Sequence, residues 1–186
     1  MRKLSPFCSA MNHLQRLLLP LSIWLLSAPA CTTTASLDLT PSPVSVQHQN
    51  LSSVQVSATG TGRSFGIGAR RVGSTDLEQA LRTAILEAGL FVEVALGGDA
   101  DWRLEVSMER LQTSDPSLTM KSTAHLRWRL INRASNHVRW ESVLKSEGKA
   151  EPRDSDDFGE RDRISTERAI SKNIAEGMRR IGSLVL

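Results

Sequence analysis

Apolar residues recur at helical spacing shortly after residue 74, where they would line one side of a helix. Thr75 and Glu78 have the spacing of a capping box, Asp76 favours the amino end of a helix, and Gly89 supplies a left-handed stop. The pattern predicts an amphipathic helix over residues 75–88. Its apolar positions are Leu77, Ala80, Leu81, Ala84, Ile85 and Ala88.

Several other stretches alternate apolar and polar residues, which is typical of strands with one buried face. The side chains of Trp102, Trp128 and Trp140 all fall on that apolar face. An aromatic ring buries roughly 150–250 Å², so we interpret the three tryptophans as core residues. The stretches with this pattern are residues 51–57, 91–95, 102–109, 118–130 and 138–145.

A second amphipathic helix is predicted near the end of the chain, over residues 164–181, after a charged hinge at residues 148–163. Its apolar stripe consists of Ile170, Ile174, Gly177, Met178 and Ile181. Two helices and a long meander indicate an α+β fold. We expect a two-layer sandwich over residues 51–186, in which an antiparallel meander sheet of four to five strands carries both helices on one face.

The first thirty residues have the three parts of a secretory leader. Arg2, Lys3 and Arg16 precede an apolar run over residues 17–26, and small residues follow at 27–30. The run is about ten residues long, whereas a membrane-spanning helix needs roughly twenty. A permanent transmembrane helix is therefore the weaker interpretation, and the true start of the chain is either Met1 or Met11.

Cys31 directly follows the small residues Ala28, Pro29 and Ala30. This arrangement resembles the lipobox of bacterial lipoproteins, in which the cysteine receives a diacylglycerol and becomes the acylated amino terminus. The resemblance implies a lipid anchor on Cys31, and Thr32 in the next position implies sorting to the outer membrane. The alternative is a soluble periplasmic protein cut after Ala30, with Cys31 as a free thiol.

Residues 31–50 are rich in Ser, Thr and Pro and contain one charged residue. Such a composition predicts an extended linker between the lipidated cysteine and the folded domain. Val44 and Val46 could add a short edge strand to the sheet.

The net charge of +3 and the pI of about 9.2 suggest an anionic partner at first sight. All three basic residues of the leader are lost with it, however, and what remains has twenty basic and twenty acidic residues. Any basic surface of the mature protein must therefore be local. Of the two cysteines, Cys8 lies in the leader, so a disulfide framework is excluded.

The sequence predicts no catalytic residues, no metal and no cofactor. His48, His125 and His137 are not arranged with a nucleophile. The acidic cluster at residues 154–160 fails as a calcium loop, because Phe158 occupies a ligand position and Ser165 stands where a bidentate glutamate belongs.

Four arginines gather around one predicted hairpin: Arg127, Arg129, Arg133 and Arg139. One interpretation is that they form cross-strand ion pairs with Glu105, Glu109 and Glu141. The other is a patch that binds an anionic glycan or lipid of the cell envelope. Nucleic acid is not expected, since the aromatic residues lie on the buried face and offer no stacking platform.

Several short motifs resemble the small outer-membrane lipoproteins of the YajG type. They are the helix end Gly89-Leu90-Phe91, the stretch from Ala100 to Val106, and Phe158-Gly159 before the final helix. These motifs recur in accessory subunits of lipid-transport and polysaccharide-export machines, whose domains are similar to the amino-terminal domain of TolB. The resemblance implies an accessory role and supplies no catalytic residue.

Taken together, these features predict an outer-membrane lipoprotein that is not an enzyme. Its domain would face the periplasm and bind a protein partner in an envelope assembly or transport complex. The alternative function is a binding module for an anionic glycan or lipid, which would use the arginine hairpin.

Overall fold

The computed structural model describes residues 37–46, 49–60, 63–65, 72–114 and 118–186. The predicted leader and Cys31 lie outside these residues. In the described part of the chain, no helix is long and apolar enough to span a membrane.

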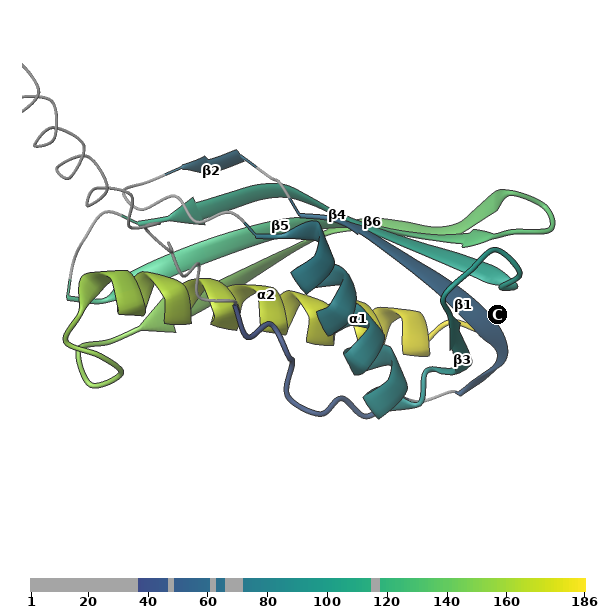
Figure 1. Cartoon of the computed structure of the whole chain (residues 1–186), viewed down its shortest axis with the longest axis horizontal. Coiled ribbons are helices and arrows are strands. Elements are labelled where there is room, and N and C mark those ends of the chain that lie inside the picture. Colours follow the sequence, from purple (N-terminus) through teal and green to yellow (C-terminus); the bar gives the residue numbers. More distant parts are fainter. Residues whose placement is uncertain (1–36, 47–48, 61–62, 66–71, 115–117) are drawn as a thin grey trace, which may run out of the picture. The chain divides into compact units, whose positions relative to one another are not determined.

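The described residues form six strands and two helices (Figure 1). The sheet has the order β3-β1-β4-β5-β6, and β2 pairs with β4 beside that path. The strands are β1 (Asn50–Thr59), β2 (Arg63–Phe65), β3 (Phe91–Ala95), β4 (Trp102–Thr113), β5 (Met120–Asn132) and β6 (His137–Ala150). The helices are α1 (Ser74–Ala88) and α2 (Phe158–Gly182).

The α+β class is confirmed, but the sheet is mixed and not an antiparallel meander. Strand β5 is antiparallel to both β4 and β6. Strand β1 is parallel to both β3 and β4, and β2 is also parallel to β4. The reason lies in the connections. Helix α1 returns the chain to the starting end of β1, as in any parallel crossover. Strand β4 then pairs with the other side of β1, so that β3 and β4 are neighbours in sequence but not in the sheet.

Both helices pack on the same face of the sheet, as Figure 1 shows. Helix α1 contacts β1 and β3, and α2 contacts β5 and β6. Trp128 is completely buried between the layers, Trp102 is nearly so, and Trp140 is partly buried. The prediction that these tryptophans face the core is therefore confirmed. They are joined there by the apolar stripe of each helix, including Leu77, Leu81, Ile85, Ile170, Ile174, Met178 and Ile181.

The predicted capping box of α1 is wrong. Gly73 is the N-cap residue and the cap has no side-chain hydrogen bond. Glu78 instead forms an ion pair with Arg82, one turn further along the helix, at 2.9 Å. The predicted stop at Gly89 is confirmed, because this residue adopts φ of 60° and its N–H bonds back to the last helical turn.

Helix α2 begins at Phe158, well before the predicted start at residue 164. Asp157 caps it by accepting a hydrogen bond of 2.7 Å from the Glu160 N–H. The first turns of α2 are strongly charged, which is why the sequence pattern predicts a hinge where the structure has a helix. On the helix, Arg163 pairs with Glu160 and Glu167 at spacings of three and four residues, which stabilises an exposed helix surface.

Candidate functional site

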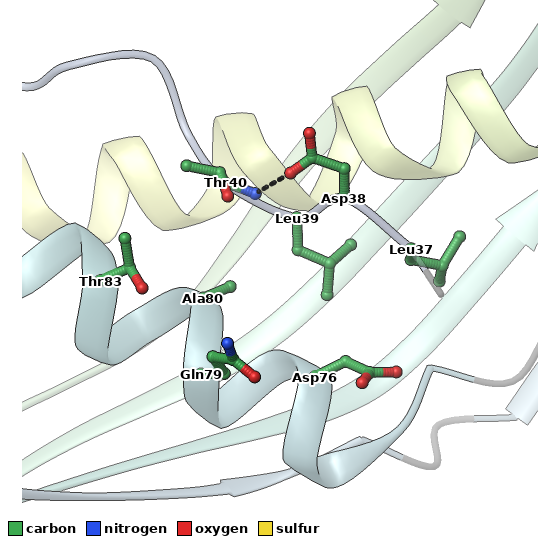
Figure 2. Close-up of a pocket in the computed structure, with 8 residues that line it drawn as sticks. All are labelled: Leu37, Asp38, Leu39, Thr40, Asp76, Gln79, Ala80 and Thr83. Atoms are coloured by element: carbon green, nitrogen blue, oxygen red, sulfur yellow. Dashed lines mark hydrogen bonds between the residues drawn. The ribbon is translucent and has the colours of Figure 1, made fainter. Parts of the chain in front are cut away.

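A hollow of about 330 Å³ lies between α1 and the chain segment at residues 37–40 (Figure 2). The segment belongs to residues 37–46, which we call the strap. The lining combines an apolar floor with polar groups from both sides. It consists of Leu37, Asp38, Leu39, Thr40, Asp76, Gln79, Ala80 and Thr83.

The strap is fastened to the helical layer at several points. Leu39 is only 2% exposed and points between the helices, where it belongs to the main core. The Asp38 N–H donates to a carboxylate oxygen of Glu167 at 2.9 Å, and the Ser171 hydroxyl donates to the Thr40 carbonyl at 3.3 Å. Residues 37–46 thus differ from the free linker predicted for residues 31–50.

The polar groups around this hollow do not converge on a common point. The Asp38 carboxylate accepts a hydrogen bond from the Thr40 N–H at 3.1 Å, so it stabilises the local backbone of the strap. Asp76, Gln79 and Thr83 are spread along α1 (Figure 2). The geometry therefore supports a structural role, in which the strap closes the core beside α1.

We expect Leu39→Ala to lower the free energy of unfolding by about 2 kcal/mol, because a buried leucine is removed from the core. We expect a loss near the lower end of the range for such substitutions, because residues 37–46 lie outside the sheet and would open locally before the sheet unfolds. Urea unfolding measures the free energy of unfolding, and the rate of proteolytic cleavage within the strap measures how often the strap detaches. Leu37→Ala is the matched control, because Leu37 is only partly buried. Equal stability of the two variants would contradict the anchoring role of Leu39.

The outer face of the sheet, away from the helices, has a row of ion pairs. Arg127 contacts Glu109 and Glu141, each at 2.6 Å. Arg129 contacts Glu105 at 2.9 Å and Glu141 at 3.5 Å. The hydrogen bonds that Arg127 donates to the carboxylates of Glu141 and Glu109 raise the pKa of its guanidinium above the usual value. This geometry agrees with the cross-strand pairing that the sequence suggested.

The other two arginines of the predicted patch contact different parts of the domain. Arg133 donates to the side-chain oxygen of Gln55 at 2.7 Å. Arg139 donates to the carbonyl of Val185, beyond the end of α2, at 2.8 Å. Arg139 is the extra residue of a bulge, because Leu130 faces Trp140 while Ile131 faces Val138. A bulge redirects a side chain in this way.

The structure thus brings Arg127 and Arg129 together but gives each of the four arginines an internal partner. An anionic ligand would have to displace Glu109 or Glu141 from the first two. Exposed ion pairs of this kind contribute roughly 0–1 kcal/mol each, so displacement is physically feasible. Binding of an anionic glycan or lipid by this hairpin stays a prediction.

The acidic loop before α2 uses its carboxylates for structural contacts. Asp157 caps the helix, as described above, and both oxygens of Asp154 accept hydrogen bonds of 2.9 Å from Arg168. The Asp154 carboxylate also accepts from the Glu151 N–H at 2.8 Å. The hydrogen bonds from Arg168, together with that from Glu151, lower the pKa of Asp154 from 3.8 to about 2.

This pKa predicts a pH-dependent part of the stability. A lowered pKa in the folded state means that the Asp154 carboxylate stabilises the fold above pH 4 and that this contribution is lost between about pH 4 and pH 2. The difference in Tm between the wild type and Asp154→Asn should therefore shrink over that interval. Arg168→Met should show the same pH profile, because it removes the main cause of the shift. A Tm difference between the wild type and Asp154→Asn that stays constant with pH would contradict the lowered pKa of Asp154.

A buried polar network joins α2 to the sheet. The indole N–H of Trp128 donates to the side-chain oxygen of Asn173 at 3.0 Å. The amide nitrogen of Asn173 donates to the Leu144 carbonyl and to the Ser146 hydroxyl, and that hydroxyl donates to the Ala169 carbonyl at 2.7 Å. These contacts satisfy the polar atoms of a fully buried asparagine. They fix how α2 lies across β5 and β6.

Sequence reasoning missed the strap and this network. For the strap a weak signal was present, since Leu37 and Leu39 alternate with polar residues within the Ser- and Pro-rich stretch. For Asn173 the sequence gave no signal, because an asparagine on a helix is far more often exposed.

Comparison with known proteins adds the fold type. The sequence matches no protein-family model, and no curated protein matches it. Protein XCC0632 from Xanthomonas campestris, of family DUF330, is similar in structure with a TM-score of 0.55 at 15% identity, covering 77% of this chain and 90% of that one. Protein CT253 from Chlamydia trachomatis has a TM-score of 0.54 at 8% identity and covers 71% and 96%.

Bacterial lipoproteins are also among the structural neighbours. A minor lipoprotein from Acinetobacter baumannii has a TM-score of 0.49 at 13% identity, covering 70% of this chain and 92% of that one. At such low identities, the two stronger similarities above establish the fold alone. The chain therefore has a fold that is shared with bacterial proteins of little sequence similarity.

Proposed function

We propose that this protein is an outer-membrane lipoprotein whose domain faces the periplasm and acts as a non-catalytic accessory subunit. The observation that carries the proposal is Cys31, which directly follows the small residues that end a secretory leader. Several acyl chains on one cysteine would hold the domain at the membrane, because each buried methylene contributes about 0.8 kcal/mol. The resemblance to YajG-type lipoproteins supports the same role.

The strap strengthens the proposal, since it shortens the connection between anchor and domain. Leu37 follows Cys31 by six residues, which can span at most about 20 Å. A linker of nineteen free residues would have reached about 60 Å. The short connection would confine the domain near the membrane and raise its effective concentration for a partner in an envelope assembly or transport complex.

Metabolic labelling with a fatty-acid analogue tests the anchor. The wild type and Cys8→Ala should incorporate the label, whereas Cys31→Ala should not, because only Cys31 would be acylated. The label should also partition with outer-membrane fractions. Equal labelling of Cys31→Ala and the wild type would refute the anchor.

Cross-linking in intact cells tests the accessory role. A partner from the envelope should be captured by the wild type and lost with Cys31→Ala, because that variant is no longer confined to the membrane. An identical cross-linking pattern for both variants would contradict recruitment through the anchor.

A further inference from the structure

The last strand of the sheet leaves one of its edges open. In the described part of the chain, β6 pairs with β5 and with no other strand. With 14 residues, β6 is the longest strand of the fold. An exposed edge of this length offers unpaired N–H and C=O groups to another chain, and proteins usually protect such edges.

One stripe of α2 protects the carboxyl-terminal part of this edge. Arg168 donates to the Lys149 carbonyl at 2.7 Å, and Lys172 donates to the Glu147 carbonyl at 3.1 Å. The next two positions at the same four-residue spacing are Glu176 and Arg180. These pair with each other at 2.7 Å, so the protection by side chains stops at Glu147.

The remaining part of the edge is open over residues 141–145. Because the carbonyls of Glu147 and Lys149 point away from β5, the alternation of an antiparallel ladder directs the backbone groups of Glu141, Val143 and Lys145 to the same side. Among the described residues, nothing bonds to the N–H and C=O groups of these three. The side chain of Val143, at the middle of this open edge, is 42% exposed.

The side chains along this open edge are complementary to themselves. Glu141 and Lys145 lie two residues before and two residues after Val143, and all three are on the outer face of the sheet. Within one copy the Glu141 carboxylate contacts Arg127 and Arg129, and Lys145 lies 3.9 Å from Glu147. These exposed pairs leave both side chains accessible to a second copy at the edge. If two copies pair in antiparallel fashion around a two-fold axis at Val143, each Glu141 lies opposite Lys145 of the second copy. Opposite charges in this position stabilise a strand pair, whereas like charges destabilise it.

We propose that two copies of this chain pair through residues 141–145 of β6, with the two-fold axis at Val143. The pairing makes one continuous sheet across both copies and satisfies the open N–H and C=O groups of Glu141, Val143 and Lys145. A two-fold interface uses the same surface on both molecules. The order Glu141, Val143, Lys145 suits such an interface, because each charged residue then lies opposite a residue of the other sign.

Disulfide trapping in the full-length, membrane-bound protein tests the register. Val143→Cys should form a cross-linked dimer on mild oxidation, because paired Cα atoms at the axis lie about 5.5 Å apart, within reach of a disulfide. Glu141→Cys and Lys145→Cys are matched controls on the same edge. Each would face its own counterpart about 14 Å away and should not cross-link. Equal yields for all three, or a cross-link of Val143→Cys to a different protein, would overturn the proposal.

Charge reversal tests whether the opposite charges of Glu141 and Lys145 stabilise the pairing, which is a separate question from the register. In the Val143→Cys background, Lys145→Glu should lower the dimer yield about tenfold, because two like-charged pairs replace two opposite ones. Adding Glu141→Gln should restore most of the yield, because it removes the like-charged pairs without placing a lysine beside Arg127 and Arg129. Thermal unfolding identifies any variant that fails to fold. A folded double variant without restored yield would count against the two-fold pairing.

Discussion

Gly148→Ala is expected to destabilise the domain by about 3 kcal/mol or more. A methyl group at this position of β6 would lie 1.9 Å from the carbonyl oxygen of Ser165 and 2.5 Å from the backbone nitrogen of Ala169. Both atoms belong to the backbone of α2, so the clash can be relieved only by moving the helix away from the sheet. Forced overpacking typically costs about 1–3 kcal/mol, and the displacement would also weaken the hydrogen bond from Ser146 to the Ala169 carbonyl.

Gly98→Ala is the matched control for this prediction, since a methyl group there meets nothing within 4 Å. Without a clash, alanine lowers the entropy of the unfolded chain and should stabilise the fold by up to about 1 kcal/mol. Urea unfolding of both variants, followed by tryptophan fluorescence, gives the two free energies. If Gly148→Ala were as stable as Gly98→Ala, the close packing of α2 on β6 would be refuted.

Trp128→Ala is expected to cost about 4 kcal/mol or more, since removal of a buried tryptophan usually costs about 3–5 kcal/mol. The ring is completely buried and lies directly against Gly177 of α2. The substitution would also leave the side-chain oxygen of Asn173 buried without its donor, which adds a penalty of about 1–3 kcal/mol. Against a typical total stability of about 5–15 kcal/mol, this loss would be a large share of the free energy of unfolding.

Two further variants separate the contribution of the buried ring from that of the indole hydrogen bond and from that of its central position. Trp128→Phe retains an aromatic ring and loses the indole N–H, so it should cost less than Trp128→Ala but more than a surface substitution. Trp140→Ala should cost less than Trp128→Ala, because Trp140 is only partly buried at the edge strand. Equilibrium unfolding measures all three. Equal costs for Trp128→Ala and Trp140→Ala would contradict the central position of Trp128.

The elements that the sequence predicted best are those with strong local patterns. The stripe from Leu77 to Ala88 predicted α1, because side chains three and four residues apart share one side of a helix. The alternation around Trp128 and Trp140 predicted β5 and β6 with the correct face buried. Such patterns depend only on residue spacing, so they can be read without knowing the partner elements.

Predictions that depended on contacts between elements far apart in sequence were less successful. The parallel pairing of β1 with β4 has no local signal, since an alternating strand pairs equally well in either direction. The start of α2 was missed because charges that pair between turns resemble those of a loop. Of the four arginines that the sequence placed around one hairpin, the structure shows Arg127 and Arg129 against Glu105, Glu109 and Glu141.

By itself, the sequence determined the α+β class and the faces that are buried, and it predicted a leader that ends before Cys31. Tertiary structure alone decided the sheet order, the attachment of the strap through Leu39, the partners of the arginines and the open edge of β6. The physical reason is that period and composition are local properties of the chain. Strand pairing, closure of the core and neutralisation of charge depend instead on residues that are far apart in sequence and meet only in the fold.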